Sequence, residues 1–127
     1  MKKSMYYITT KNSDGIKYQT VVGYVFKQGG CYFGVSNKKP NGSTRKYWSI
    51  THLKTGMLCG YVDKKSDASR FLSESTPEFW ELLKNPDKHF ISMMDKNDHI
   101  IEMIEKEILK NSLLDEVYAK NFINSEC

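Results

Sequence analysis

Cysteine and histidine, the residue types best suited to nucleophilic or metal chemistry, are sparse in this chain. They are Cys31, Cys59, Cys127, His52, His89 and His99. Cys59 and His52 are close enough in sequence to suggest a nucleophile with its general base. The register of the hairpin that joins them points their side chains to opposite faces, and no carboxylate lies nearby to orient the histidine. We therefore expect a histidine at the edge of the core and a small buried thiol, with no catalytic residue among them.

Spacing patterns that hold metals or phosphates are also missing from the sequence. The cysteines and histidines do not form CxxC, HxxxH or HExxH, so no metal site is expected. The glycines form neither GxGxxG nor GxxxxGK[ST], the patterns that bind nucleotide phosphates. The glutamates at 102, 105 and 107 alternate with lysines, as on a solvated helix face. These patterns predict a non-enzymatic protein without a cofactor, although a catalytic site assembled from residues distant in sequence stays open.

Charge is distributed unevenly along the chain. Residues 1–65 carry twelve Lys and Arg against two acids, for a net charge of +10, whereas residues 66–127 carry a net −6. This asymmetry predicts an anionic partner for the first half, either nucleic acid or an acidic protein. The alternative is that the two halves attract each other within the fold.

The candidate binding residues combine cations with aromatic rings in the basic half. They are Lys17, Tyr32, Lys38, Lys39, Arg45, Lys46, Tyr47, Thr51, His52, Lys54 and Tyr61. Sequence-tolerant nucleic-acid binders use lysine and arginine for phosphates and exposed rings for stacking on bases. The first functional prediction is therefore a basic, aromatic sheet that contacts nucleic acid.

Two other functions use the same residues. Tyrosine, tryptophan and arginine are common anchors of protein interfaces, so the chain could be a small phage or mobile-element inhibitor that blocks a host protein, for example a defence or nucleic-acid-processing component. Lysine, asparagine and isoleucine are abundant and arginine occurs only twice, which indicates an AT-rich coding sequence, as in a low-GC bacterium or a phage. A third hypothesis is a sequesterer of a small anion such as a nucleotide, in a pocket near the hairpin hinge. Its lining would be Arg45, Trp48, Thr51, His52 and Thr55.

The basic half consists of strand-like segments. Residues 5–10, 16–26, 31–36, 46–53 and 57–62 are rich in aromatic and β-branched residues and are separated by glycine-containing turns. The simplest topology for them is an antiparallel meander of about five strands. A sheet of this kind usually has one face on a core and one face in solvent.

Two hairpins can be assigned a register. With Lys54-Thr55-Gly56 as a three-residue loop, Leu53 faces Met57. Trp48, Ile50, Leu58 and Val62 then share the core face with His52 at its edge, and Arg45, Tyr47, Ser49, Thr51, Cys59 and Tyr61 share the other. With Gln28 and Gly29 as the second turn, Val22, Tyr24 and Phe26 share a face with Cys31, Phe33 and Val35.

The second half has helical periodicity. Ser66 and Thr76 are predicted N-caps of two short helices, the second with Pro77 at its first position. A longer helix follows Pro86, with a break near Asn97 and Asp98, and a last helix starts at Ser112. The apolar stripe of the longer helix after Pro86 comprises Phe90, Met93, Met94, Ile101, Ile104, Ile108 and Leu109. These helices are expected to cover the apolar face of the sheet in a two-layer α+β domain.

The whole chain has the length of one domain, with a basic sheet part at 1–65 and an acidic helical part at 66–127. No apolar run reaches the roughly 18 residues of a membrane span, and the first residues lack a secretory pattern. We expect a cytoplasmic protein with reduced cysteines that has no membrane partner. Part of the C-terminal apolar stripe could form a homodimer interface.

Overall fold

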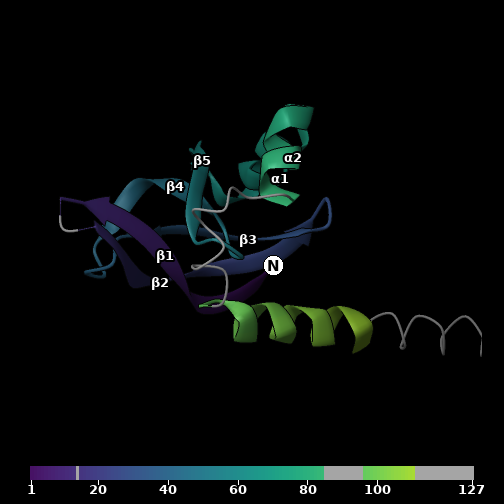
Figure 1. Ribbon diagram of the computed structural model, residues 1–127, viewed down its shortest axis with the longest axis horizontal. Helices are drawn as coiled ribbons and strands as arrows, with labels where there is room; N and C mark the ends of the chain where they lie inside the picture. Colours follow the sequence, from purple (N-terminus) through teal and green to yellow (C-terminus); the bar gives the residue numbers. More distant parts are fainter. Residues whose placement is uncertain (14, 85–95, 111–127) are drawn as a thin grey trace, which may run out of the picture.

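The computed structural model describes residues 1–13, 15–84 and 96–110. Its main element is one five-stranded antiparallel sheet in the order β1-β2-β3-β4-β5 (Figure 1). The strands are β1 (Lys2–Asn12), β2 (Gly15–Gln28), β3 (Cys31–Lys38), β4 (Thr44–His52) and β5 (Met57–Val62). Each strand pairs with the next one along the chain, so the predicted meander and the α+β class are confirmed.

Helices follow the sheet in sequence, as predicted. A 3₁₀ turn (η1, Lys65–Asp67) leads into α1 (Ala68–Ser73) and α2 (Pro77–Lys84), and a further helix spans residues 98–110. Thr76 does cap α2, because its hydroxyl accepts a bond from the Phe79 N–H at 3.3 Å. Ser66 is not a cap, since it lies inside η1 and the α1 cap position is Asp67. Phe90, Met93, Met94 and the helix expected from Ser112 lie outside the described residues.

The β2–β3 hairpin turns at Gly29 and Gly30, both with positive φ, and Gln28 pairs with Cys31. The predicted turn was one residue too early. That error shifts the register by two positions, and two positions preserve the face of every side chain. The prediction that the aromatic residues of β2 share a face with Phe33 and Val35 is therefore right.

The β4–β5 hairpin has its predicted register away from the turn, where Trp48 pairs with Val62, Ser49 with Tyr61 and Ile50 with Gly60, but it differs next to the turn. Its turn contains four residues, 53–56, so that His52 instead of Leu53 lies opposite Met57. The register then shifts, because Thr51 pairs with Leu58 and Ile50 with Gly60. An extra residue in one strand exchanges the faces of its neighbours. Cys59 consequently packs in the core and Leu58 is 48% exposed, the reverse of the expectation.

Helices cover both faces of the sheet (Figure 1). On one face α1 and α2 enclose a core built around Phe33, Val35 and Ile50. On the other face the helix at 98–110 places Ile100, Ile101 and Ile104 against a second core. The expectation of two layers with one solvent face was wrong. The reason lies in the alternation of the strands, since Tyr6, Val21 and Val25 give the second face its own apolar side chains.

The outer edge of β1 is tied to the β4–β5 turn and to the start of the helix at 98–110. The Thr9 N–H donates to the Gly56 carbonyl at 2.8 Å. The buried Asn97 side chain accepts from the Tyr7 N–H at 2.8 Å and donates to the carbonyls of Tyr7 and Leu53 at 2.9 and 2.8 Å. One amide thus satisfies backbone groups that an edge strand would otherwise leave unpaired. It also anchors the helix, because the Asn97 carbonyl accepts the first helical N–H groups.

Candidate functional site

The structure separates the predicted binding residues into three groups. In an antiparallel meander the β1–β2 and β3–β4 connections lie at the same end of the sheet. The first group lies at or beside this basic end and comprises Lys17, Lys38, Lys39, Arg45, Lys46, Tyr47 and Tyr61. Tyr32 and Lys54 lie toward the opposite end, and Thr51 and His52 lie in the interior.

The interior pair has a structural role. Thr51 and His52 are each 2% exposed, and His52 Nδ1 lies 2.9 Å from Thr55 Oγ1, which also accepts the Met57 N–H. Burial, with a smaller effect from the charge of Lys54, lowers the pKa of His52 from 6.5 to about 4. A neutral histidine that closes the hairpin turn is not available to a ligand at the surface.

Cys59 and His52 lie on the same face after all, because the register shift turns Cys59 toward the core. Their electrostatics are nevertheless opposite to those of a catalytic pair. Burial raises the pKa of the Cys59 thiol to about 12 and lowers that of His52 to about 4. A thiolate–imidazolium pair needs the reverse directions. Both residues therefore act as neutral parts of the core.

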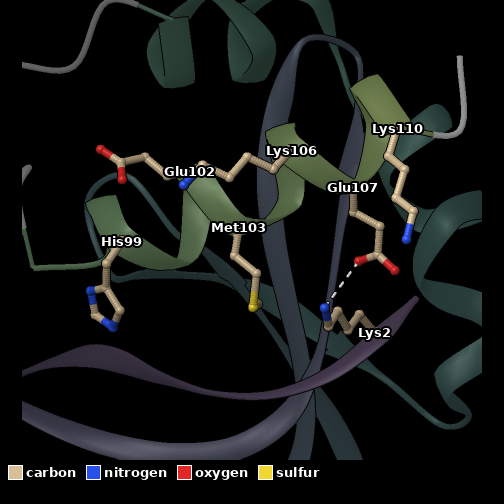
Figure 2. Close-up of a pocket in the computed structure, with 7 residues that line it drawn as sticks. All are labelled: Lys2, His99, Glu102, Met103, Lys106, Glu107 and Lys110. Atoms are coloured by element: carbon tan, nitrogen blue, oxygen red, sulfur yellow. Dashed lines mark ion pairs between the residues drawn. The ribbon is translucent and has the colours of Figure 1, made fainter. Parts of the chain in front are cut away.

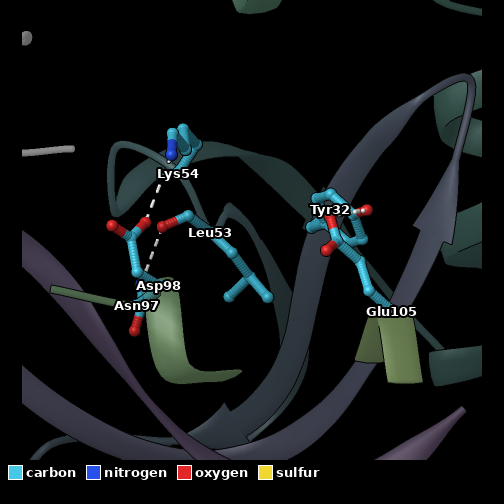
Figure 3. Close-up of polar contacts among 6 residues, drawn as sticks. All are labelled: Tyr32, Leu53, Lys54, Asn97, Asp98 and Glu105. Atoms are coloured by element: carbon cyan, nitrogen blue, oxygen red, sulfur yellow. Dashed lines mark hydrogen bonds and ion pairs between the residues drawn. The ribbon is translucent and has the colours of Figure 1, made fainter. Parts of the chain in front are cut away.

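Tyr32 and Lys54 each contact an acid of the helix at 98–110 (Figure 3). The Tyr32 hydroxyl donates to Glu105 Oε1 at 2.6 Å, and Lys54 Nζ lies 3.2 Å from Asp98 Oδ1. Burial and then the Glu105 contact raise the pKa of Tyr32 to about 12. At this place the acidic half neutralises the basic half within the chain. The attraction between halves therefore accounts for part of the charge asymmetry.

The rings of Tyr47 and Tyr61 are 43% and 50% exposed and pack edge to face, with centroids 4.9 Å apart at 80°. Ser49 pairs with Tyr61 across β4 and β5, so the two tyrosines share a face of the sheet. The Arg45 guanidinium carbon lies 5.9 Å from the Tyr47 ring centroid. Lys46, the next residue along the strand, is exposed on the opposite face of the sheet. We call Arg45, Tyr47 and Tyr61 the tyrosine surface.

Further cations adjoin the tyrosine surface. Lys38 Nζ donates to Thr44 Oγ1 at 2.6 Å, and Lys39 is exposed at the start of a turn closed by its bonds with Gly42 and Ser43. Lys64 is exposed just after β5, whose end pairs with the first half of β4. Sequence reasoning missed Lys64, although the hairpin pairing would have placed it near Lys46. Asp63 is exposed at the same end.

A shallow groove of about 570 Å³ lies between the N-terminal end of β1 and the helix at 98–110 (Figure 2). It is lined by Lys2, His99, Glu102, Met103, Lys106, Glu107 and Lys110. Its charges are mixed, and Lys2 Nζ already pairs with Glu107 Oε2 at 3.4 Å. Sequence reasoning could not assemble this groove, because Lys2 is nearly one hundred positions from the helix. With three lysines against two glutamates, the groove has too little net charge to favour anions or cations strongly.

In the described part of the chain no helix is long and apolar enough to cross a membrane. Across residues 1–13, 15–84 and 96–110, no three histidine, cysteine or acidic side chains come together as a metal site. Comparison of the chain with protein-family models, curated proteins and solved structures yields no match.

Proposed function

We propose that this chain is a non-enzymatic nucleic-acid-binding protein that uses the tyrosine surface and the adjoining lysines. The observation that carries the proposal is the exposed pair of Tyr47 and Tyr61, whose rings pack together beside Arg45. Such rings offer stacking platforms that every base can use. The neighbouring cations offer contacts to phosphates.

The position of the surface supports this function. The tyrosine surface lies away from Tyr32 and Lys54, which contact acids of the helix at 98–110. Lys38, Lys39, Lys46 and Lys64 add positive charge at the same end of the sheet. The site therefore keeps an electrostatic attraction for polyanions that the rest of the basic half has partly neutralised. The opposite pKa shifts of Cys59 and His52 support a role without catalysis.

The test is binding of labelled DNA and RNA oligonucleotides at low and at physiological salt. Contacts to phosphates release counterions, so affinity should fall steeply as salt rises. Lys46→Ala should weaken binding and reduce the salt slope by about one phosphate contact. Lys84→Ala is the matched control, because Lys84 is equally exposed but lies at the end of α2. Absence of binding at low salt would refute the proposed function.

A protein partner is the second candidate, and exposed Leu58 favours it. Leu58 pairs with Thr51 as Tyr61 pairs with Ser49, so a leucine extends the two tyrosines along one sheet face. Aromatic and apolar anchors next to arginine are typical of protein interfaces. In this case the chain would be a small phage or mobile-element inhibitor that binds an acidic host protein. Truncation of Tyr47 would then abolish binding at any salt concentration.

Three remaining proposals have weaker support. A small anion near the hinge would meet Thr51, His52 and Thr55 only as buried groups already engaged with the turn. A homodimer through the helix at 98–110 would use Ile108 and Leu109, both exposed, and sedimentation would reveal it. We also propose a cytoplasmic location, because a nucleic-acid ligand would be available there.

A further inference from the structure

We propose that the tyrosine surface selects single-stranded nucleic acid over duplex, with Tyr61 as the ring on which an unpaired base stacks. This inference rests on the proposed function and adds the class of ligand and the residue that recognises it. It follows from the arrangement of Tyr61, Tyr47 and Arg45, from the face of the sheet that carries them and from the position of the lysines.

Tyr61 is the more available of the two rings. Tyr47 has the Arg45 guanidinium over its ring, with the guanidinium carbon 5.9 Å from the centroid, and it also contacts Tyr61. In an edge-to-face pair each ring covers at most one face of the other. Tyr61 therefore keeps at least one face free of both neighbours, consistent with its 50% exposure. Tyr47 holds Arg45 and Tyr61 in place and contacts the ligand less.

A ring in this position can stack only on a base whose face is accessible. In a duplex each base is stacked between its neighbours, and extracting one costs at least as much free energy as a single stack on tyrosine returns. Tyr61 lies on a strand, at the penultimate position of β5, and not on a long loop that could reach into a groove. Duplex would therefore meet only the lysines.

The helices also disfavour reading of a duplex. Proteins that read duplex DNA commonly insert a helix or a β-ribbon into the major groove. Here α1 buries Ala68 and Leu72 in the core around Phe33, on the sheet face opposite the tyrosines. The helix at 98–110 buries three isoleucines in the other core. Both are committed to packing against the sheet.

The lysines are positioned for one backbone. Lys38 and Lys39 lie at the end of β3, Lys46 on β4 and Lys64 after β5. Adjacent strands are about 4.8 Å apart, so three strand ends span roughly 10 Å. Lys46 lies on the sheet face opposite Tyr61, so these cations line the end of the sheet next to the tyrosine face. A row of this length suits a single sugar-phosphate chain that crosses the strand ends and carries its bases onto Tyr61.

The experiment measures anisotropy of a labelled single-stranded oligothymidylate, an abasic strand of the same length and a duplex of the same length. The wild-type protein should bind the oligothymidylate about tenfold more tightly than the abasic strand or the duplex. Tyr61→Leu should lose about the same factor for the oligothymidylate alone, and Tyr61→Phe should retain binding because the ring remains. The comparison of strands uses unaltered protein, so it stands even if Tyr61→Leu does not fold.

Two results separate this inference from the proposed function. Equal, salt-dependent binding of the three nucleic acids, unchanged in Tyr61→Leu, would overturn single-strand selection and leave nucleic-acid binding intact. No binding of any of them at low salt would overturn the proposed function and this inference with it.

Discussion

The buried His52 should make the stability of this protein fall in mild acid. Its pKa is lowered from 6.5 to about 4 by burial, so the folded state resists a proton that the unfolded state accepts. Stability is then fully present above pH 6.5 and is lost as the pH falls toward 4. Because each unit of pKa difference corresponds to about 1.4 kcal/mol, the full loss is about 3 kcal/mol. A domain of this size has roughly 5 to 15 kcal/mol in total.

Urea unfolding, followed by the fluorescence of Trp48 and Trp80, measures this loss. Between pH 7.5 and pH 5 the wild-type protein should lose about 2 kcal/mol through His52 alone. In His52→Gln the amide can still reach Thr55 but cannot take up a proton in this range. The variant should be less stable at neutral pH, with a shallower dependence on pH. Equal losses in both proteins between the two pH values would refute the reasoning.

Three further predictions concern contacts across the sheet. Asn97→Ala should lower the free energy of unfolding by about 3 to 5 kcal/mol in urea titrations, since it leaves buried backbone groups of β1 and the turn without partners; a loss below 1 kcal/mol would contradict this. Gly34→Ala should lower Tm markedly, at a cost of about 1 to 3 kcal/mol, because its Cβ would lie 2.6 Å from Tyr6 Cε1; an unchanged Tm would show that the Tyr6 ring can move. Tyr32→Phe should lower the free energy of unfolding by about 1 kcal/mol in urea titrations, because it removes the hydrogen bond to Glu105; an unchanged free energy of unfolding would argue against that bond.

Much of the fold follows from local sequence patterns. Alternation of side chains and the glycine turns predicted five antiparallel strands, and the change of period predicted the helices after them. For the Gly29-Gly30 hairpin the predicted turn was one residue early, but the predicted faces of the side chains were right, because the error moved the register by an even number of residues. In the β4–β5 hairpin the register is right from Ile50 outward, but a bulge next to the turn reverses the faces of Leu58 and Cys59. The residue types around Cys59 do not predict that bulge.

The candidate site was predictable only in its ingredients. The composition identified tyrosines and cations of the basic half, and pairing of β4 with β5 brings Tyr47 and Tyr61 together. It could not show that the side chains of Thr51 and His52 are buried. It also could not show that Tyr32 bonds to Glu105 and that Lys54 pairs with Asp98. Those contacts join residues more than forty positions apart.

The sequence by itself thus determined the class of fold, the order of strands and the excess of positive charge in the first half, because each depends on neighbours along the chain or on composition. The tertiary structure decided which cations remain available. Helix 98–110 packs its isoleucines on one face of the sheet, and that packing brings its acids onto the nearby lysines and Tyr32. Burial of apolar area sets where the helix lies, and the charges follow it. The tyrosine surface remains exposed because neither helical layer extends over it.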